Sequence, residues 1–288
     1  MKKFFMFVLV IGVVVLIACG GGDEDDGTVA TESEESSLQA SDSSDDKSPP
    51  TKVDTETPSY SGIETGGGTL TRLWADPPTL DPHLTGDTTS AGVVVEIFSG
   101  LVALNTDLEL VPDIAESWDI SGMGEVYTFR IRDDVTFHNG RKVMAADFKW
   151  SLERAASPKL ASHLAETYLN DIVGATEYID GEADSIKGIT VIDDKTLQIT
   201  VDAPKAYFLA KLTYPTAYVL DRETVEGGGR NWWVTDPVGT GPFKMSEYSI
   251  GERITLERFG GYYRDPQPQL DTIQLNLAGG QAMAMYEN

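Results

Sequence analysis

Residues 127–140 read YTFRIRDDVTFHNG and carry the clearest secondary-structure pattern of the chain. Tyr127, Phe129 and Ile131 alternate with polar residues, which is the pattern of a strand with one buried face. Asp133-Asp134 then turns the chain back, and Asn139-Gly140 provides residues that tolerate a positive φ. The stretch therefore predicts a strand followed by tight turns.

Strands and helices alternate on both sides of this stretch. Alternating apolar residues predict strands over residues 69–74, 191–192, 197–201, 253–258 and 272–277. Helical spacing of apolar residues predicts helices over 89–104 and 146–156, the second with Phe148 and Leu152 one turn apart. Because the two element types are interspersed without an internal repeat, the fold class is mixed α/β.

The charge of the chain excludes one large class of function. Its 288 residues hold 46 acidic and 22 basic side chains, a formal net charge of −24. So acidic a protein is repelled by phosphate backbones, and we expect no nucleic-acid partner. With one cysteine and three histidines, the chain has no disulfide framework and little material for imidazole or thiolate chemistry.

The N-terminus has the features of a lipoprotein signal. A cationic head precedes an apolar run from Phe4 to Ala18, which is short for a membrane-spanning helix. The run ends in Leu16-Ile17-Ala18-Cys19, a lipobox-like sequence that contains the only cysteine. We therefore predict a signal peptide over residues 1–19 and lipidation of Cys19. An ordinary signal peptide or an uncleaved anchor is the alternative.

Residues 20–65 form an acidic segment. It contains 13 acidic residues against Lys47 and Lys52, and it has no aromatic residue before Tyr60. Such a composition does not bury enough apolar surface to offset its ordering entropy. We predict a disordered tether that holds a folded body away from a membrane; an acidic interaction tail is the alternative.

Sequence signatures of catalysis are missing. The chain has no G-x-S-x-G elbow, no H-E-x-x-H helix and no C-x-x-C pair, so we expect no enzymatic activity, no metal site and no cofactor. His163 and Glu166 share a predicted helix face but are too few ligands for a metal. Asp147 and Glu153 are interpreted as solvated helix positions, and Gly227–Gly229 as a flexible turn.

From Gly66 onward the chain resembles a known family. Eight short motifs follow one another in order, at Gly67–Leu70, Pro78–His83, Gly100–Val102, Leu110–Trp118, Tyr127–Gly140, Ala145–Phe148, Pro237–Phe243 and Glu257–Phe259. They resemble the extracytoplasmic solute-binding proteins of ABC importers, specifically family 5, the peptide/nickel type.

The resemblance implies a fold and a domain organisation. Members have the type II periplasmic-binding-protein fold, a clam of two lobes in which ligand binds between the lobes. Residues 66–288 would be the N-terminal part of this domain, with a sub-domain inserted in the first lobe at about residues 99–213. The chain stops where the family continues, so we expect a truncated product that holds the first lobe and part of the hinge side and lacks the second lobe.

The resemblance also implies candidate site residues. The loop after Asp81-Pro82 would face the ligand cleft and contribute Gly86, Asp87, Thr88 and Thr89, and the Gly-Thr-Gly turn would contribute Thr240. Small polar residues and backbone N–H groups of this kind bind a peptide main chain without recognising its side chains. Plain turn chemistry is the alternative explanation for these residues.

The implied function is that of a lipid-anchored, extracytoplasmic binding subunit of an ABC importer. It would capture peptides and deliver them to permease subunits with their ATPases. The same scaffold binding nickel chelates, opines, haem or oligosaccharides is an alternative, and a non-transport adhesin or sensor lipoprotein is a second one.

Overall fold

The computed structural model describes residues 66–277. The predicted signal peptide, Cys19 and the acidic segment predicted to be a tether lie outside the described residues. The strands are β1 (Thr69–Trp74), β2 (Val102–Leu104), β3 (Leu110–Pro112), β4 (Ala115–Ser121), β5 (Val126–Ile131), β6 (Ile189–Asp193), β7 (Thr196–Thr200), β8 (Phe243–Ser249), β9 (Arg253–Arg258) and β10 (Thr272–Leu277). The α-helices are α1 (Thr88–Ile97), α2 (Ala145–Ala156), α3 (Ala165–Leu169), α4 (Ala175–Ile179), α5 (Phe208–Lys211), α6 (Arg222–Gly228) and α7 (Trp232–Thr235). Short 3₁₀ turns lie at Pro82–Leu84, Gly122–Gly124, Pro215–Ala217 and Gly229–Asn231.

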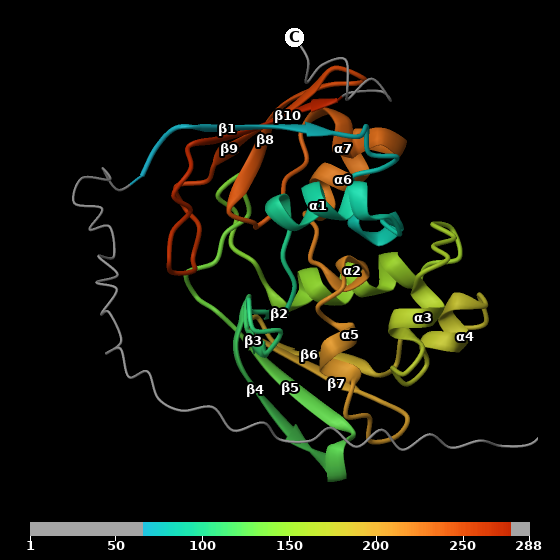
Figure 1. Ribbon diagram of the computed structural model, residues 1–288. Coiled ribbons are helices and arrows are strands. Elements are labelled where there is room, and N and C mark those ends of the chain that lie inside the picture. Colours follow the sequence, from blue (N-terminus) through green and yellow to red (C-terminus); the bar gives the residue numbers. More distant parts are fainter. Residues whose placement is uncertain (1–65, 278–288) are drawn as a thin grey trace, which may run out of the picture. The chain divides into compact units, whose positions relative to one another are not determined.

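One four-stranded sheet has the order β1-β10-β9-β8 (Figure 1). β1 pairs in parallel with β10, whereas β10, β9 and β8 pair antiparallel. Ile273, Leu275 and Leu277 of β10 are buried and alternate with half-buried polar residues, as their period of two predicts. The strands predicted over 69–74, 253–258 and 272–277 are confirmed.

The second four-stranded sheet has the order β4-β5-β7-β6 and is antiparallel throughout. Tyr127, Phe129 and Ile131 of β5 are buried, as the opening pattern predicts. β6 and β7, at the strands predicted over 191–192 and 197–201, pair antiparallel and are joined at Asp193–Thr196. Gly140 of the predicted turn has a φ of 85°, as expected, so a residue with a Cβ would be strained there.

α2 makes apolar contacts on one face and polar contacts on another. Phe148, Leu152 and Ala155 are fully buried in the apolar cluster against the second sheet. Asp147, Ser151 and Arg154 occur at i, i+4 and i+7 and therefore share another face. These three polar side chains all accept or donate hydrogen bonds to residues outside α2. The helix thus buries an apolar stripe on one side and a polar stripe on the other.

Four sequence interpretations were wrong. The helix expected over 89–104 ends at Ile97, because the chain extends at Phe98 and Ser99-Gly100 leads into β2. Asp147 is not a solvated position, since its carboxylate accepts hydrogen bonds from Met144 N–H (2.9 Å) and Arg141 (3.0 Å).

Glu153 also differs from the expectation of a solvated residue, because it accepts a hydrogen bond from the N–H of Ile186 at 3.2 Å. Gly227 and Gly228 belong to the last turn of α6 rather than to a flexible turn, and Gly229 follows with a φ of 68°.

The buried apolar residues form two separate clusters. The first consists of buried apolar residues taken from between Leu101 and Val219, together with Val238 and Tyr263. It includes residues of the second sheet and of α2. The second joins Leu80 and α1 to α6, α7 and the first sheet. The predicted domain limits, including the inserted sub-domain at about 99–213, stay predictions.

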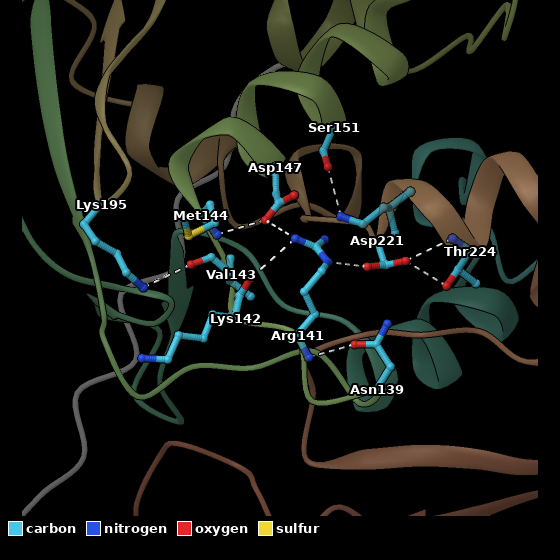
Figure 2. A network of polar contacts seen from close by, with 11 residues as sticks. Asn139, Arg141, Lys142, Val143, Met144, Asp147, Ser151, Lys195, Asp221 and Thr224 are labelled. Atoms are coloured by element: carbon cyan, nitrogen blue, oxygen red, sulfur yellow. Dashed lines mark hydrogen bonds and ion pairs between the residues drawn. The ribbon is translucent and has the colours of Figure 1, made fainter.

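Polar contacts connect the elements of the two clusters (Figure 2). The guanidinium of Arg141 donates to Asp147 of α2 at 3.0 Å and to Asp221 at 2.8 Å. Asp221 in turn caps α6 by accepting from the N–H of Thr224 at 2.9 Å. Ser151 of α2 accepts from the N–H of Leu220 at 2.9 Å. The N-terminal half of α2 is thereby fixed to the start of α6.

The last turn of α2 makes the second connection. Arg154 forms a two-pronged ion pair with Asp81, with N–O distances of 3.0 and 2.5 Å. Asp81 is 2% exposed and also accepts from the indole N–H of Trp232 at 3.3 Å.

No helix within residues 66–277 is long and apolar enough to cross a bilayer.

Replacement of Arg154 should destabilise the protein strongly. Arg154→Gln removes the charge partner of a buried carboxylate, which typically costs about 3–5 kcal/mol of unfolding free energy. Chemical denaturation would measure it. Arg130→Gln is the matched control, because Arg130 pairs with Glu116 on the surface with side chains 59% and 45% exposed, and such pairs contribute less than about 1 kcal/mol. Equal losses in both variants would contradict a special role for the buried pair.

Candidate functional site

The loop that the sequence analysis assigned to ligand binding lies at the N-terminus of α1. Gly86 and Thr88 are exposed, and Asp87 and Thr89 are half-buried. Asp87 is the N-cap of α1, where its carboxylate accepts a hydrogen bond from the N–H of Ser90 at 2.8 Å. The carbonyl of Thr89 accepts from the indole N–H of Trp74 at 3.0 Å. The loop is therefore held at its second half by the helix cap and by β1.

Its first half rests on a buried polar layer. Thr85 is fully buried, and its hydroxyl donates to the carbonyl of Asp81 at 2.9 Å. His83 is also fully buried: Nδ1 lies 2.9 Å from a guanidinium N–H of Arg154, and Nε2 lies 3.0 Å from the carbonyl of Tyr218. The guanidinium can only donate, so Nδ1 accepts and Nε2–H donates. Burial, together with the charge of Arg154, lowers the pKa of His83 to about 4, and the ring is neutral.

Aromatic side chains border the loop. A methyl group added at Gly86 would come within 3.0 Å of Nε2 of His163, so glycine permits the close approach of this imidazole. The hydroxyl of Tyr214 donates to the carbonyl of Thr85 at 3.3 Å. Tyr168 stacks on Tyr214 with ring centroids 3.9 Å apart and planes 11° apart. We call loop 85–89 with His163, Tyr168 and Tyr214 the loop 85–89 surface.

The chemistry of this surface suits non-covalent binding. Ser162, the hydroxyl next to His163, donates to the carbonyl of His83 at 2.6 Å, so its proton is not directed at a general base. His163 and Glu166 are both exposed, and they do not share a helix face as predicted, because His163 lies before α3. Within residues 66–277, no three histidine, cysteine, aspartate or glutamate side chains come together as a metal site. The surface instead offers exposed backbone groups, the hydroxyl of Thr88 and half-buried aromatic rings.

Thr240 lies away from this surface. Gly239 and Gly241 on either side of it pack against the last turn of α1, where a Cβ at Gly239 would overlap the carbonyl oxygen of Ile97. Because α1 has 10 residues, this turn lies about 15 Å from loop 85–89 along the helix axis. Thr240 is fully buried, and its hydroxyl has no hydrogen-bond partner among the described residues. The structure thus separates the predicted site residues into two groups, and their binding roles stay predictions.

His138 holds the segment around Thr240. Its backbone N–H donates to Gly239 O at 2.8 Å, Nδ1 accepts from Gly239 N–H at 3.3 Å, and Nε2 lies 3.1 Å from Gly241 O. The hydrogen bond from Gly239 leaves Nε2–H as the donor to Gly241. Burial lowers the pKa of His138 to about 4, so this ring is neutral as well. His138 directly precedes the predicted turn at Asn139-Gly140, and its ring is bound to Gly241, 103 positions further along the chain.

Sequence reasoning missed Tyr168 and Tyr214 and considered His163 only as a metal ligand. These residues follow loop 85–89 by about 80 to 130 positions along the chain, as the contact of Tyr214 with Thr85 shows (129 positions). They carry no shared local motif, and only the packing of α3 with the segment before it, and of the 3₁₀ turn at Pro215–Ala217, brings them beside the loop.

Comparison with protein families identifies relatives. Residues 109–286 match the family described as bacterial extracellular solute-binding proteins, family 5. The dipeptide-binding protein DppE of Bacillus subtilis is 32% identical over 204 residues, which cover 69% of this chain and 37% of that protein. The chain therefore spans somewhat more than a third of the length of this curated relative.

Solved structures show the same fold. A periplasmic oligopeptide-binding protein of Borrelia burgdorferi superposes with a TM-score of 0.70 and 33% identity, covering 77% of this chain and 45% of that one. The binding protein AgaA in complex with agropinic acid, from A. tumefaciens R10, gives a TM-score of 0.66 and 28% identity over 76% and 41% of the two chains. The expected resemblance and the type II periplasmic-binding-protein fold are thus confirmed, and the chain covers part of that fold.

The two neutral histidines predict acid sensitivity. Their pKa is about 4 in the folded state and 6.5 ordinarily, so below pH 6.5 the unfolded chain binds protons that the folded chain does not. The unfolding free energy should therefore be largest above pH 6.5 and fall toward pH 4, by up to about 1.4 kcal/mol per pH unit for each histidine. Burial raises the pKa of Asp113 and Glu96, which opposes the trend at the acidic end.

Denaturation curves between pH 7 and 5 would measure this slope. His138→Asn should reduce it by about half, because one of the two buried rings is gone. A slope that is the same in His138→Asn and in the wild type would contradict the assignment.

Proposed function

We propose that this chain, which belongs to the bacterial extracellular solute-binding proteins of family 5, binds peptides non-covalently for an ABC importer. The observation that supports this most directly is the loop 85–89 surface on a fold of this family. The named relative DppE is a dipeptide-binding protein, and the Borrelia neighbour is an oligopeptide-binding protein. Family membership supports the class of function, and the exposure of loop 85–89 supports the proposal that binding occurs there.

The surface suits a peptide main chain. Gly86 and Thr88 are exposed where the backbone runs between two fixed points, Thr85 and the cap of α1. Backbone N–H and C=O groups held in this way pair with an extended peptide regardless of its sequence. The half-buried rings of Tyr168 and Tyr214 provide a flat apolar floor for peptide side chains. Recognition would therefore depend on main-chain hydrogen bonds and aromatic contact.

An opine is the rival ligand class, because the neighbour AgaA was solved with agropinic acid. Nickel chelates, haem or oligosaccharides remain alternatives on the same scaffold, and so does a non-transport adhesin or sensor lipoprotein. Delivery to permease subunits with their ATPases is part of the proposal. Incubation of the protein with a peptide digest and with opines, followed by native mass spectrometry, would separate the ligand classes.

Replacement of Tyr214 should weaken peptide binding. Tyr214→Ala removes the stacked ring and the hydrogen bond to Thr85, and losses of about 1–1.5 kcal/mol correspond to a roughly five- to tenfold higher Kd. Isothermal titration calorimetry with a peptide retained in the mass-spectrometry experiment would measure it. Tyr178→Ala is the control, since Tyr178 lines a separate groove with α2 and α6. Unchanged affinity in Tyr214→Ala would exclude this surface as the site.

We also propose that Cys19 is lipidated and anchors the chain to the outer face of a membrane, with residues 20–65 as the tether. The basis is the sequence Leu16-Ile17-Ala18-Cys19 after the apolar run. Two or more acyl chains give stable anchoring, since each buried CH₂ contributes about 0.8 kcal/mol.

Lipidation has a direct test. In a bacterium grown with labelled palmitate, the wild-type chain should carry label and fractionate with membranes, because the thioether forms only at a cysteine. Cys19→Ala should carry none. Equal labelling of the two proteins would exclude Cys19 as the anchor.

A further inference from the structure

A polar cavity lies where the elements of the two apolar clusters meet. Its volume is about 310 Å³, and the C-terminal end of α1, strand β2 and the segments around Thr213, Tyr218 and Tyr262 line it. None of its lining residues belongs to the loop 85–89 surface. A second groove of about 340 Å³ continues from it and shares Pro242, Tyr262 and Arg264. This size is at the lower end of small-molecule sites.

A buried carboxylate lines the cavity. Asp113 is 5% exposed, and its Oδ1 accepts from the hydroxyl of Tyr263 at 2.7 Å and from Nη1 of Arg264 at 3.3 Å. Even so, burial raises the pKa of Asp113 above its ordinary value, because desolvation outweighs these partners. The ionised carboxylate is therefore under-compensated, and a further cationic group in the cavity would stabilise it.

The opposite charge is supplied by Arg264. Its side chain is 32% exposed, and its contact with Asp113 is made through Nη1 at 3.3 Å. A guanidinium has five N–H donors, so Arg264 can also bind a carboxylate in two-pronged geometry. The cavity thus presents an anion and a cation side by side, with the aromatic rings of Phe98, Tyr218 and Tyr262 around them.

We propose that this cavity binds a free α-amino acid as its zwitterion. The ammonium group would contact Asp113, the carboxylate would contact Arg264, and an apolar side chain would lie against the aromatic lining or extend into the adjoining groove. A ligand with only a positive charge would be repelled by Arg264, and a ligand with only a negative charge would be repelled by Asp113. The paired charges therefore favour a zwitterion. The site lies outside the loop 85–89 surface and goes beyond the proposed function.

Calorimetry on the purified 288-residue chain tests the proposal, with L-leucine as the probe. L-Leucine should bind saturably, and both N-acetyl-L-leucine and L-leucinamide, which each lack one charge, should bind at least about tenfold more weakly. Arg264→Gln and Asp113→Asn should weaken L-leucine binding to a similar extent. Arg264 is partly exposed, so Arg264→Gln keeps the test valid if Asp113→Asn does not fold.

Tyr178→Ala, which alters the separate groove beside α2 and α6, is the matched control and should bind L-leucine like the wild type. The two proposals fail separately, because peptide binding is tested at Tyr214 and leucine binding at Arg264. The proposal is overturned if the folded chain shows no saturable heat with L-leucine up to about 10 mM. It is equally overturned if the wild-type protein binds the two derivatives as tightly as it binds L-leucine. The same holds if the Arg264→Gln protein binds L-leucine as tightly as the wild type does.

Discussion

The ion pair between Arg154 and Asp81 is the constraint on which the arrangement of the described residues depends. It joins positions 73 residues apart and connects α2, which packs in the first apolar cluster, to the segment that leads into α1. A buried pair is costly to desolvate and is tolerated only where its remaining donors and acceptors are satisfied. Here the indole of Trp232 and the backbone N–H of His83 donate further hydrogen bonds to Asp81, and the ring of His83 accepts one from Arg154. The pair thereby fixes the start of loop 85–89.

The elements of the two clusters are joined by polar contacts in addition to apolar packing, such as that of Trp150 of α2 against the second cluster. Apolar contacts tolerate sliding, whereas a hydrogen bond is lost over a small displacement. Arg154 and Ser151 on α2, and the neutral rings of His83 and His138, all bond to backbone or carboxylate groups of another segment. We interpret these contacts as the features that set one orientation of α2 against α1 and α6. Protonation of either ring would turn its acceptor nitrogen into a donor and break the hydrogen bond that it accepts. The contacts between these segments should therefore weaken in acid.

The sequence was most informative where structure is local. Alternation at Tyr127, Phe129 and Ile131 identified β5, and the spacing of Phe148 and Leu152 identified α2, because both signals come from residues that share one element. The helix expected to continue to Leu104 stops at Ile97, since apolar composition alone does not separate a buried helix from the strand that follows it. Asp147 was misjudged because its partner Arg141 reaches it from outside the helix. Tyr214 and Tyr168 were not found, because their relation to Thr85 exists only after long-range packing.

Charge also explains the character of the proposed binding surface. In a chain with a formal net charge of −24, any fixed carboxylate near a ligand would select strongly against acidic peptides. Asp87, the one acidic residue in loop 85–89, is half-buried, and its carboxylate accepts a hydrogen bond from the N–H of Ser90 at the positive end of α1, which partly offsets its charge. The surface that remains consists of backbone groups, a hydroxyl and aromatic rings. Such a surface binds main chains of many sequences with similar affinity, and discrimination between ligands then has to come from groups outside loop 85–89.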